Sequence, residues 1–197
     1  VGGGGWCGAA CAWWRARTGL GVTLVDALEP GGGASTEGVG LVAGVSEPYG
    51  RSVDRLGRER ARALEAFSQS SREALLADIV GDQGPQISLS DGGVLHAASA
   101  ARGAEELERS GALLAEDGFP RLWLERHVVA AGVGGEGLVG GLLDAAGCAV
   151  HPSQLLELLL SRTLEAGVRV LAGHRVFAVT SAAQGVVLKS ERASFHA

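Results

Sequence analysis

The sequence predicts an α/β fold of the doubly wound, Rossmann-like type, with a partial α+β domain inserted between its two ends. Two observations predict this fold. Near the start, a glycine cluster within residues 2–8 is followed by a helical segment and by a β-branched run at residues 22–25. Near the end, a helical segment that begins at Pro152 is again followed by a β-branched run. This alternation of helix and strand is typical of a parallel sheet that is covered by helices.

The outer elements each have a local reason. The alanine-rich residues 9–18 are expected to form the first helix, since alanine has the highest helix propensity. Residues 22–25 are short, apolar and β-branched, as in a buried parallel strand. Pro152 suits the first turn of a helix that Gly167 ends. Further strands are expected at residues 168–171, 176–179 and 186–188.

The middle of the chain combines helices with short strands. Residues 52–80 are expected to form one helix, because six apolar residues recur there at helical spacing: Leu56, Leu64, Phe67, Leu75, Leu76 and Ile79. The charged residues at 51–62 are interpreted as a solvated helix face. A second amphipathic helix is expected at residues 101–115, and strands are expected at 86–89, 93–97, 122–124 and 138–143.

Composition excludes several classes of function. The chain has 197 residues, of which 46% are hydrophobic and 20% charged, as in a folded globular protein of one domain or slightly more. The net charge of −5, without any basic cluster, argues against a nucleic-acid partner. No apolar run reaches the roughly 18 residues of a membrane span. We therefore expect a soluble protein, cytoplasmic by default; its compartment and oligomeric state are not determined by the sequence.

The glycine cluster carries a motif. Gly3, Gly5 and Gly8 match the pattern G-x-G-x-x-G, and Asp26 ends the β-branched run that follows. Glycines at this spacing let the backbone approach a pyrophosphate, and an acidic residue at the end of the second strand accepts hydrogen bonds from a ribose. The pattern predicts a dinucleotide site; the alternative is a plain β-α-β turn that binds no nucleotide. Because so little chain precedes the motif, the first strand is expected to be nearly absent.

Other chemistry-bearing residues form no clear motif. Cys7 and Cys11 lie one helical turn apart and are interpreted as buried small residues on a helix rather than as a metal-binding or redox pair. Arg121 and Arg126 flank an apolar strand, where they could face an anionic substrate or be exposed charges. No zinc, phosphate-loop or nucleophile-elbow motif is present, so no metal ligand and no catalytic residue is assigned.

Several segments together resemble the FAD-dependent amine and amino-acid oxidoreductases related to D-amino-acid oxidase, glycine oxidase and sarcosine oxidase. The resemblance covers most of the chain and rests on residues 3–8, 22–26, 30–35 with 40–41, and 140–176. It implies that FAD is the cofactor. It also implies that residues 1–44 and 150–197 form an FAD-binding domain and that residues 45–149 form a linking helix and a partial substrate domain.

The resemblance assigns candidate FAD contacts. The implied cofactor site consists of Gly3, Gly5, Trp6, Cys7, Gly8, Asp26, Ala27, Ala34, Ser35, Val39, Gly40, Leu41 and Val176. The amides of the glycine turn would hold the pyrophosphate and Asp26 the ribose hydroxyls. The Ser35 hydroxyl would bind phosphate or ribose, although Ser35 could also cap a helix together with Thr36. Backbone at residues 39–41 would position the flavin, and backbone at Val176 would touch the adenine.

The activity implied is oxidation of the C–N bond of a small-molecule amino acid or amine by hydride transfer to the flavin. Because members of that family are longer, both chain ends look truncated and the chain is expected to be a fragment. The family's carboxylate-binding arginine and tyrosine would lie outside it, and Tyr49 is not given that role. Trp6 stands where the family carries a small aliphatic residue. Two alternatives are a non-catalytic remnant or regulatory module with a nucleotide fold, and an NAD-dependent dehydrogenase, which residues 30–41 disfavour.

Overall fold

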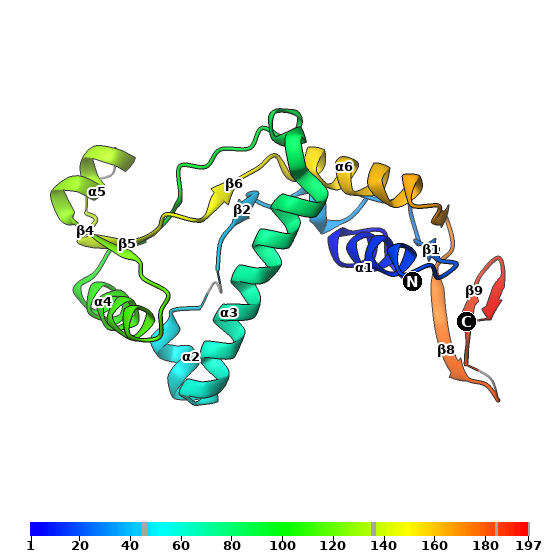
Figure 1. Ribbon diagram of the computed structural model, residues 1–197, viewed down its shortest axis with the longest axis horizontal. Coiled ribbons are helices and arrows are strands. Elements are labelled where there is room, and N and C mark those ends of the chain that lie inside the picture. The colour runs from blue at the N-terminus through cyan, green and yellow to red at the C-terminus, as the bar shows by residue number, and fades with distance from the viewer. Residues whose placement is uncertain (45–46, 135–136, 184, 197) are drawn as a thin grey trace. The chain divides into compact units, whose positions relative to one another are not determined.

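A computed structural model describes residues 1–44, 47–134, 137–183 and 185–196 (Figure 1). The chain divides into two compact units: Val1–Val39 with His151–Ala197, and Gly40–Val150. The domain boundary predicted at residue 45 lies outside the described residues.

The first unit contains the predicted parallel strands. Strand β1 (Thr23–Val25) pairs in parallel with β7 (Arg169–Leu171), with Leu24 opposite Val170. The chain before helix α1 (Trp6–Arg17) adds only an isolated parallel bridge between Gly2 and Val25, so the first strand is nearly absent, as predicted. The mixed α/β class predicted from the sequence is confirmed.

Small residues let the two helices of this unit pack closely. Helix α1 contacts α6 (Pro152–Glu165), where the Thr163 hydroxyl donates hydrogen bonds to the carbonyl oxygens of Leu159 at 2.7 Å and Ala9 at 3.3 Å. The sheet side of α1 is apolar, since Ala12, Leu24 and Val168 form one buried cluster. The adjacent Trp13 and Trp14 divide between core and surface, with 6% and 41% of each residue exposed.

An antiparallel sheet completes the first unit. Strands β8 (Val176–Ser181), β9 (Val186–Ser190) and β10 (Ser194–His196) follow one another as neighbours. The first two match the predicted strands, whereas β10 was not predicted, because its three residues contain a single apolar side chain and so no strand pattern. A short 3₁₀ segment, η1 (Ala34–Thr36), lies in the loop after β1.

The second unit is built on a three-stranded antiparallel sheet of order β3-β5-β4. Its strands are β3 (Val94–Ala98), β4 (Leu122–Glu125) and β5 (Gly140–Asp144), and helix α4 (Ala101–Glu116) packs against it. Its remaining elements are β2 (Leu41–Val42), α2 (Tyr49–Leu56), α3 (Arg58–Ala74), η2 (Leu75–Val80), η3 (Gly81–Ile87), α5 (Arg126–Val133) and β6 (Cys148–Ala149).

The prediction of one helix over residues 52–80 is wrong. Gly57, with φ of +81°, separates α2 from α3, and the last turn widens into a π-helix. The predicted apolar stripe is wrong as well, since Phe67 is 71% exposed while Glu65 and Arg72 are buried. The strand predicted at 86–89 is also wrong, because residues 81–87 form the 3₁₀ segment η3, which contains Pro85.

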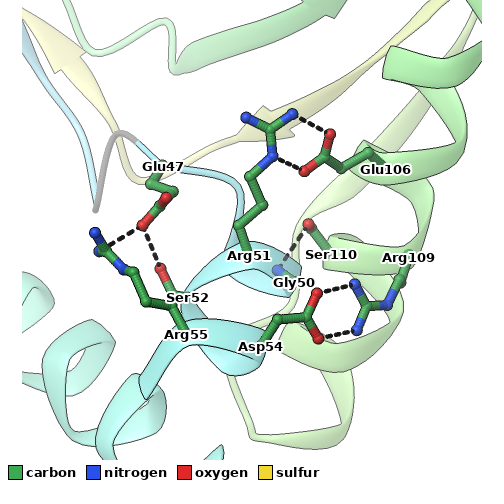
Figure 2. Close-up of polar contacts among 9 residues, drawn as sticks. All are labelled: Glu47, Gly50, Arg51, Ser52, Asp54, Arg55, Glu106, Arg109 and Ser110. Carbon is green, nitrogen blue, oxygen red and sulfur yellow. Dashed lines mark hydrogen bonds and ion pairs between the residues drawn. The ribbon is translucent and has the colours of Figure 1, made fainter. Parts of the chain in front are cut away.

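The charged side chains at residues 51–62 are exposed, as predicted for a solvated face, and several of them also form ion pairs. Figure 2 shows the Arg51 guanidinium on the Glu106 carboxylate, and Arg109 on Asp54 with N–O distances of 2.6 and 2.8 Å. These pairs join α2 to α4 beside a buried hydrogen bond from the Gly50 amide to Ser110 Oγ. Glu106 and Arg109 on α4 thus neutralise the charges of Arg51 and Asp54 on α2.

Candidate nucleotide-binding site

The beginning of α1 is arranged as an anion-binding site. Gly5 is the N-cap in an extended conformation, and its carbonyl accepts the first helical hydrogen bond, from Ala9 N–H at 2.9 Å. The amides of Cys7 and Gly8 lie in the first turn, where a helix offers no acceptor of its own. The first turn contains no acidic residue. Its partial positive charge is therefore available to a negatively charged group.

Glycine is required here by close contacts. A Cβ on Gly8 would lie 1.7 Å from the Gly3 carbonyl oxygen, and a Cβ on Gly5 would lie 2.7 Å from Ser35 Oγ. Gly3 has φ of +94°, which disfavours any other residue. Each of the three glycines of the motif thus has its own geometric reason, and the predicted approach of this backbone to a pyrophosphate stays a prediction.

An open hollow of about 530 Å³ lies against this turn. Its lining includes most of the predicted residues of the glycine turn and of the following loop: Gly2, Gly3, Gly5, Trp6, Cys7, Gly8, Ala34, Ser35 and Gly38. The volume is within the usual range of ligand sites, roughly 300–1,000 Å³.

Ser35 links the loop to the helix. Its Oγ accepts a hydrogen bond from the Trp6 amide at 3.3 Å, and so satisfies one of the amides that a helix start leaves unpaired. Within its own segment η1 the cap position is Gly33, and no side-chain cap is made. The predicted cap of Ser35 together with Thr36 is therefore not made; Ser35 instead caps α1, and its hydroxyl hydrogen can still be donated to a ligand.

Asp26 ties the end of β1 to the glycine turn. One carboxylate oxygen accepts a short hydrogen bond from the Gly4 amide, and the other accepts one from the Leu28 amide at 2.8 Å. Each carboxylate oxygen has two lone pairs, so acceptor capacity remains. The Asp26 carbonyl accepts from His174 N–H at 2.7 Å, which brings the strand that begins at Val176 to this end of the unit.

Six predicted contacts are not part of the hollow's lining: Asp26, Ala27, Val39, Gly40, Leu41 and Val176. Val39 is 84% exposed. Gly40 and Leu41 belong to the second unit, where the Gly40 carbonyl accepts from Val150 N–H at 2.9 Å and Leu41 pairs with Ala149. Their roles stay predictions, as do those of exposed Ala27 and of Val176.

The expectation that Cys7 and Cys11 are buried is wrong. Both are exposed, because the side of α1 that packs inward carries Ala9, Ala12 and Trp13 instead. Within the described residues, no three or more His, Cys, Asp or Glu side chains are grouped to hold a metal ion. A search of the same part of the chain finds no helix of the length and apolar character needed to cross a membrane.

The sequence did not predict a buried charge network in the second unit. Arg121 Nη2 lies 2.8 Å from Glu65 Oε1 and 3.2 Å from Asp144 Oδ2, and Arg72 Nη1 also lies 3.2 Å from Asp144 Oδ2. At most 9% of each side chain is exposed. Neither interpretation of Arg121 was right, since this side chain is neither exposed nor free to bind an anion. The seven-residue spacing of Glu65 and Arg72, two turns on one helix face, was the available signal.

This network borders a cavity of about 50 Å³, which also includes Tyr49 and His96 in its lining. The Tyr49 hydroxyl donates to Asp117 Oδ2 at 2.6 Å. Burial and this hydrogen bond raise the pKa of Tyr49 above its ordinary value. The same bond and the Arg58 guanidinium lower the pKa of Asp117. Arg126, the other arginine beside the strand, is exposed at the start of α5.

The model of a family described as FAD dependent oxidoreductase (DAO) matches residues 1–197. No curated protein sequence matches the chain significantly.

Several solved structures share the fold. Glycine oxidase from Geobacillus kaustophilus is 24% identical with a TM-score of 0.74, and the match covers 100% of this chain and 52% of that one. L-proline dehydrogenase from P. horikoshii (15% identity, TM-score 0.74) is covered to 49%, with 100% of this chain matched. L-amino acid deaminase from Proteus myxofaciens (16%, 0.72) is covered to 42%, with 99% of this chain matched. The chain thus spans about half the length of the first two structures.

Proposed function

Because this chain belongs to the FAD-dependent oxidoreductase family, we propose that its first unit binds FAD and that the protein oxidises the C–N bond of an amino acid or amine. The observation that carries the proposal is the hollow at the start of α1. There, first-turn backbone amides, the Ser35 hydroxyl and the start of a helix border one open space.

The residues present suit a diphosphate. Two first-turn amides, those of Cys7 and Gly8, would donate to its oxygens, as would the Ser35 hydroxyl. The helix end would stabilise the negative charge without any basic side chain. Gly3 and Ala34 would form the wall that the diphosphate approaches.

The contacts to the ribose, adenine and flavin of FAD are assigned relative to the proposed position of the diphosphate. Asp26 would accept hydrogen bonds from the ribose hydroxyls, and Ala27 and the backbone of Val176 would lie near the adenine. The predicted flavin contacts of Val39, Gly40 and Leu41 complete the set. Bound FAD would supply the redox chemistry by accepting a hydride, while the chain's residues hold and orient it.

Cofactor binding tests the proposal directly. We expect the purified protein, incubated with excess FAD and then dialysed, to keep a visible flavin absorption spectrum. A protein that loses all flavin on dialysis and shows no saturable binding of FAD would contradict the proposal. That result would favour the non-catalytic alternative.

A glycine pair supplies the matched control. Gly8→Ala should abolish FAD retention, because its Cβ would lie 1.7 Å from the Gly3 carbonyl oxygen. Gly21→Ala adds the same methyl group where no atom lies within 4 Å and should leave retention unchanged. Equal retention by both variants would mean that FAD, if bound, does not use this turn.

The substrate class is tested on the flavin-loaded protein. Under anaerobic conditions, reduction of the flavin is measured as the loss of its visible absorption. The compounds to add are glycine, L-proline and other L-amino acids, after which the similar structures are named. We expect at least one amino acid or amine to reduce the flavin. A flavin-loaded protein that none of them reduces would retain the binding proposal and contradict the proposed reaction.

A further inference from the structure

Two exposed thiols lie in one row on helix α1. Cys7 and Cys11 are both free and exposed, and because they are four residues apart they occupy the same side of the helix, one turn from each other. The other side of α1 carries the buried residues Ala9, Ala12 and Trp13. Packing in the core therefore accounts for neither cysteine, and both thiols are open to a ligand from solvent.

The spacing of the two thiols suits a shared ion better than a disulfide. Helix residues four apart have Cβ atoms about 5–6 Å apart, whereas a disulfide needs about 3.5–4.5 Å. Two sulfurs on opposite sides of one ion would lie about 4.6 Å apart if each bond had the length of a zinc–thiolate bond, about 2.3 Å. Helical side chains lean toward the N-terminus, which directs the Cys11 thiol toward the turn of Cys7. Both thiols can thus reach one ion while α1 stays intact.

The number of ligands restricts the ion. Across the described ranges of the chain, no three His, Cys, Asp or Glu side chains are grouped around a possible metal position, so the pair acts without a third ligand of these kinds. Zinc in a structural site takes four protein ligands. Thiolates select soft ions, and Cu(I) is a soft ion that two thiolates in a line can satisfy. The pair therefore fits Cu(I) better than zinc.

We propose that Cys7 and Cys11 form a two-thiolate site for a soft monovalent metal ion, Cu(I). Binding exchanges the two thiol protons for one ion and changes the oxidation state of neither copper nor sulfur. Cys7 also borders the hollow at the start of α1. The inference goes beyond the proposed function, because Cu(I) binding requires neither FAD nor the hollow, and a failure of FAD binding would leave it standing.

Competition with a coloured Cu(I) chelator, bathocuproine disulfonate, tests the site under anaerobic conditions with ascorbate as the reductant. We expect the unaltered protein to take up one Cu(I) per chain. Cys7→Ser and Cys11→Ser should each weaken the binding by about a hundredfold or more, because the second thiolate acts as a tethered ligand. Cys148→Ala removes the buried thiol and should leave the affinity unchanged.

A second readout needs no variant. Iodoacetamide should alkylate Cys7 and Cys11 in the metal-free protein, since both are exposed. One equivalent of Cu(I) should protect both at once, as measured by mass spectrometry of the peptide that contains them. This measurement decides the question even if a serine variant does not fold.

Four results would overturn the inference. The first is that the reduced protein takes up no Cu(I) in competition with the chelator. The second and third are an affinity that either serine variant leaves unchanged, and protection of one of the two cysteines without the other, since both mean that a single thiol binds. The fourth is a complex of two chains per ion in native mass spectrometry, which would place the ion between copies of the chain.

Discussion

The start of α1 and the junction of α2 with α4 hold their charges in opposite ways. The first is built from backbone amides, one serine and glycine, and offers positive character without a basic side chain. The second is built from arginine and carboxylate side chains that neutralise one another (Figure 2). Charge left unpaired at a helix end attracts a ligand, whereas charge paired within the chain stabilises the fold. The difference separates a candidate site from a structural element that is richer in charge.

The largest effect is expected in the buried charge network of the second unit, which consists of Glu65, Arg72, Arg121 and Asp144. Asp144→Ala removes the carboxylate shared by Arg72 and Arg121 and leaves Arg72 buried without its partner. We expect a loss of about 3–5 kcal/mol in the free energy of unfolding, measured with urea.

A matched double variant serves as the control. Arg72→Met combined with Asp144→Leu removes one charge of each sign and should cost far less, since exchange of a buried ion pair for apolar residues is often neutral. If Asp144→Ala proves as stable as the double variant, the network is not holding the unit together.

A smaller effect is expected at the serine that caps α1. Ser35→Ala leaves the Trp6 amide without its acceptor and should lower the free energy of unfolding by about 1 kcal/mol. Saturating ADP should stabilise Ser35→Ala less than it stabilises the unaltered protein, because the variant lacks the hydroxyl that is proposed to donate to the diphosphate. Thermal melts with and without ADP measure both effects.

The neighbouring residue, Thr36, supplies the control. Thr36→Val removes a hydroxyl that bonds only within the loop, to the carbonyls of Gly31 and Gly33. Its melting temperature should respond to ADP as the unaltered protein does. An equal response from Ser35→Ala would show that the Ser35 hydroxyl is not at the ligand.

The same contrast explains what the sequence could predict. The glycine turn was predictable because its residues are close together and glycine leaves a spacing pattern, with Asp26 at the end of the next strand. Helix α4 and strands β1 and β7 were predictable from local periodicity. The partner Glu106 of Arg51, the partner Asp117 of Arg58 and the partner Glu65 of Arg121 lie 55 to 59 residues away, so a single sequence shows the charges without their pairing.

Where the prediction failed, a longer-range contact decided the outcome. Glu65 and Arg72 interrupt the apolar pattern of α3 yet are buried, because Arg121 and Asp144 compensate them. The break at Gly57 was hidden within a continuous helical pattern. Cys7 and Cys11 were wrongly predicted to be buried, because their spacing fits either side of α1. In the structure, the buried side of α1 carries Ala9 and Ala12 instead.

The smallest predicted effect concerns pH at the junction of α2 and α4. Hydrogen bonds from Arg109 and Arg51 lower the pKa of Asp54 and of Glu106 below their ordinary values. A carboxyl whose folded-state pKa is depressed stabilises the fold above its unfolded pKa of about 4, and this contribution is lost as the pH falls through the folded value. We therefore expect the unfolding free energy of Asp54→Asn/Glu106→Gln, measured with urea, to fall less steeply than that of the unaltered protein below about pH 4. Because Asp54 is exposed and Glu106 is partly exposed, 1 M salt should shrink the difference. Parallel pH profiles of the two proteins would show that the pairs form without contributing to stability.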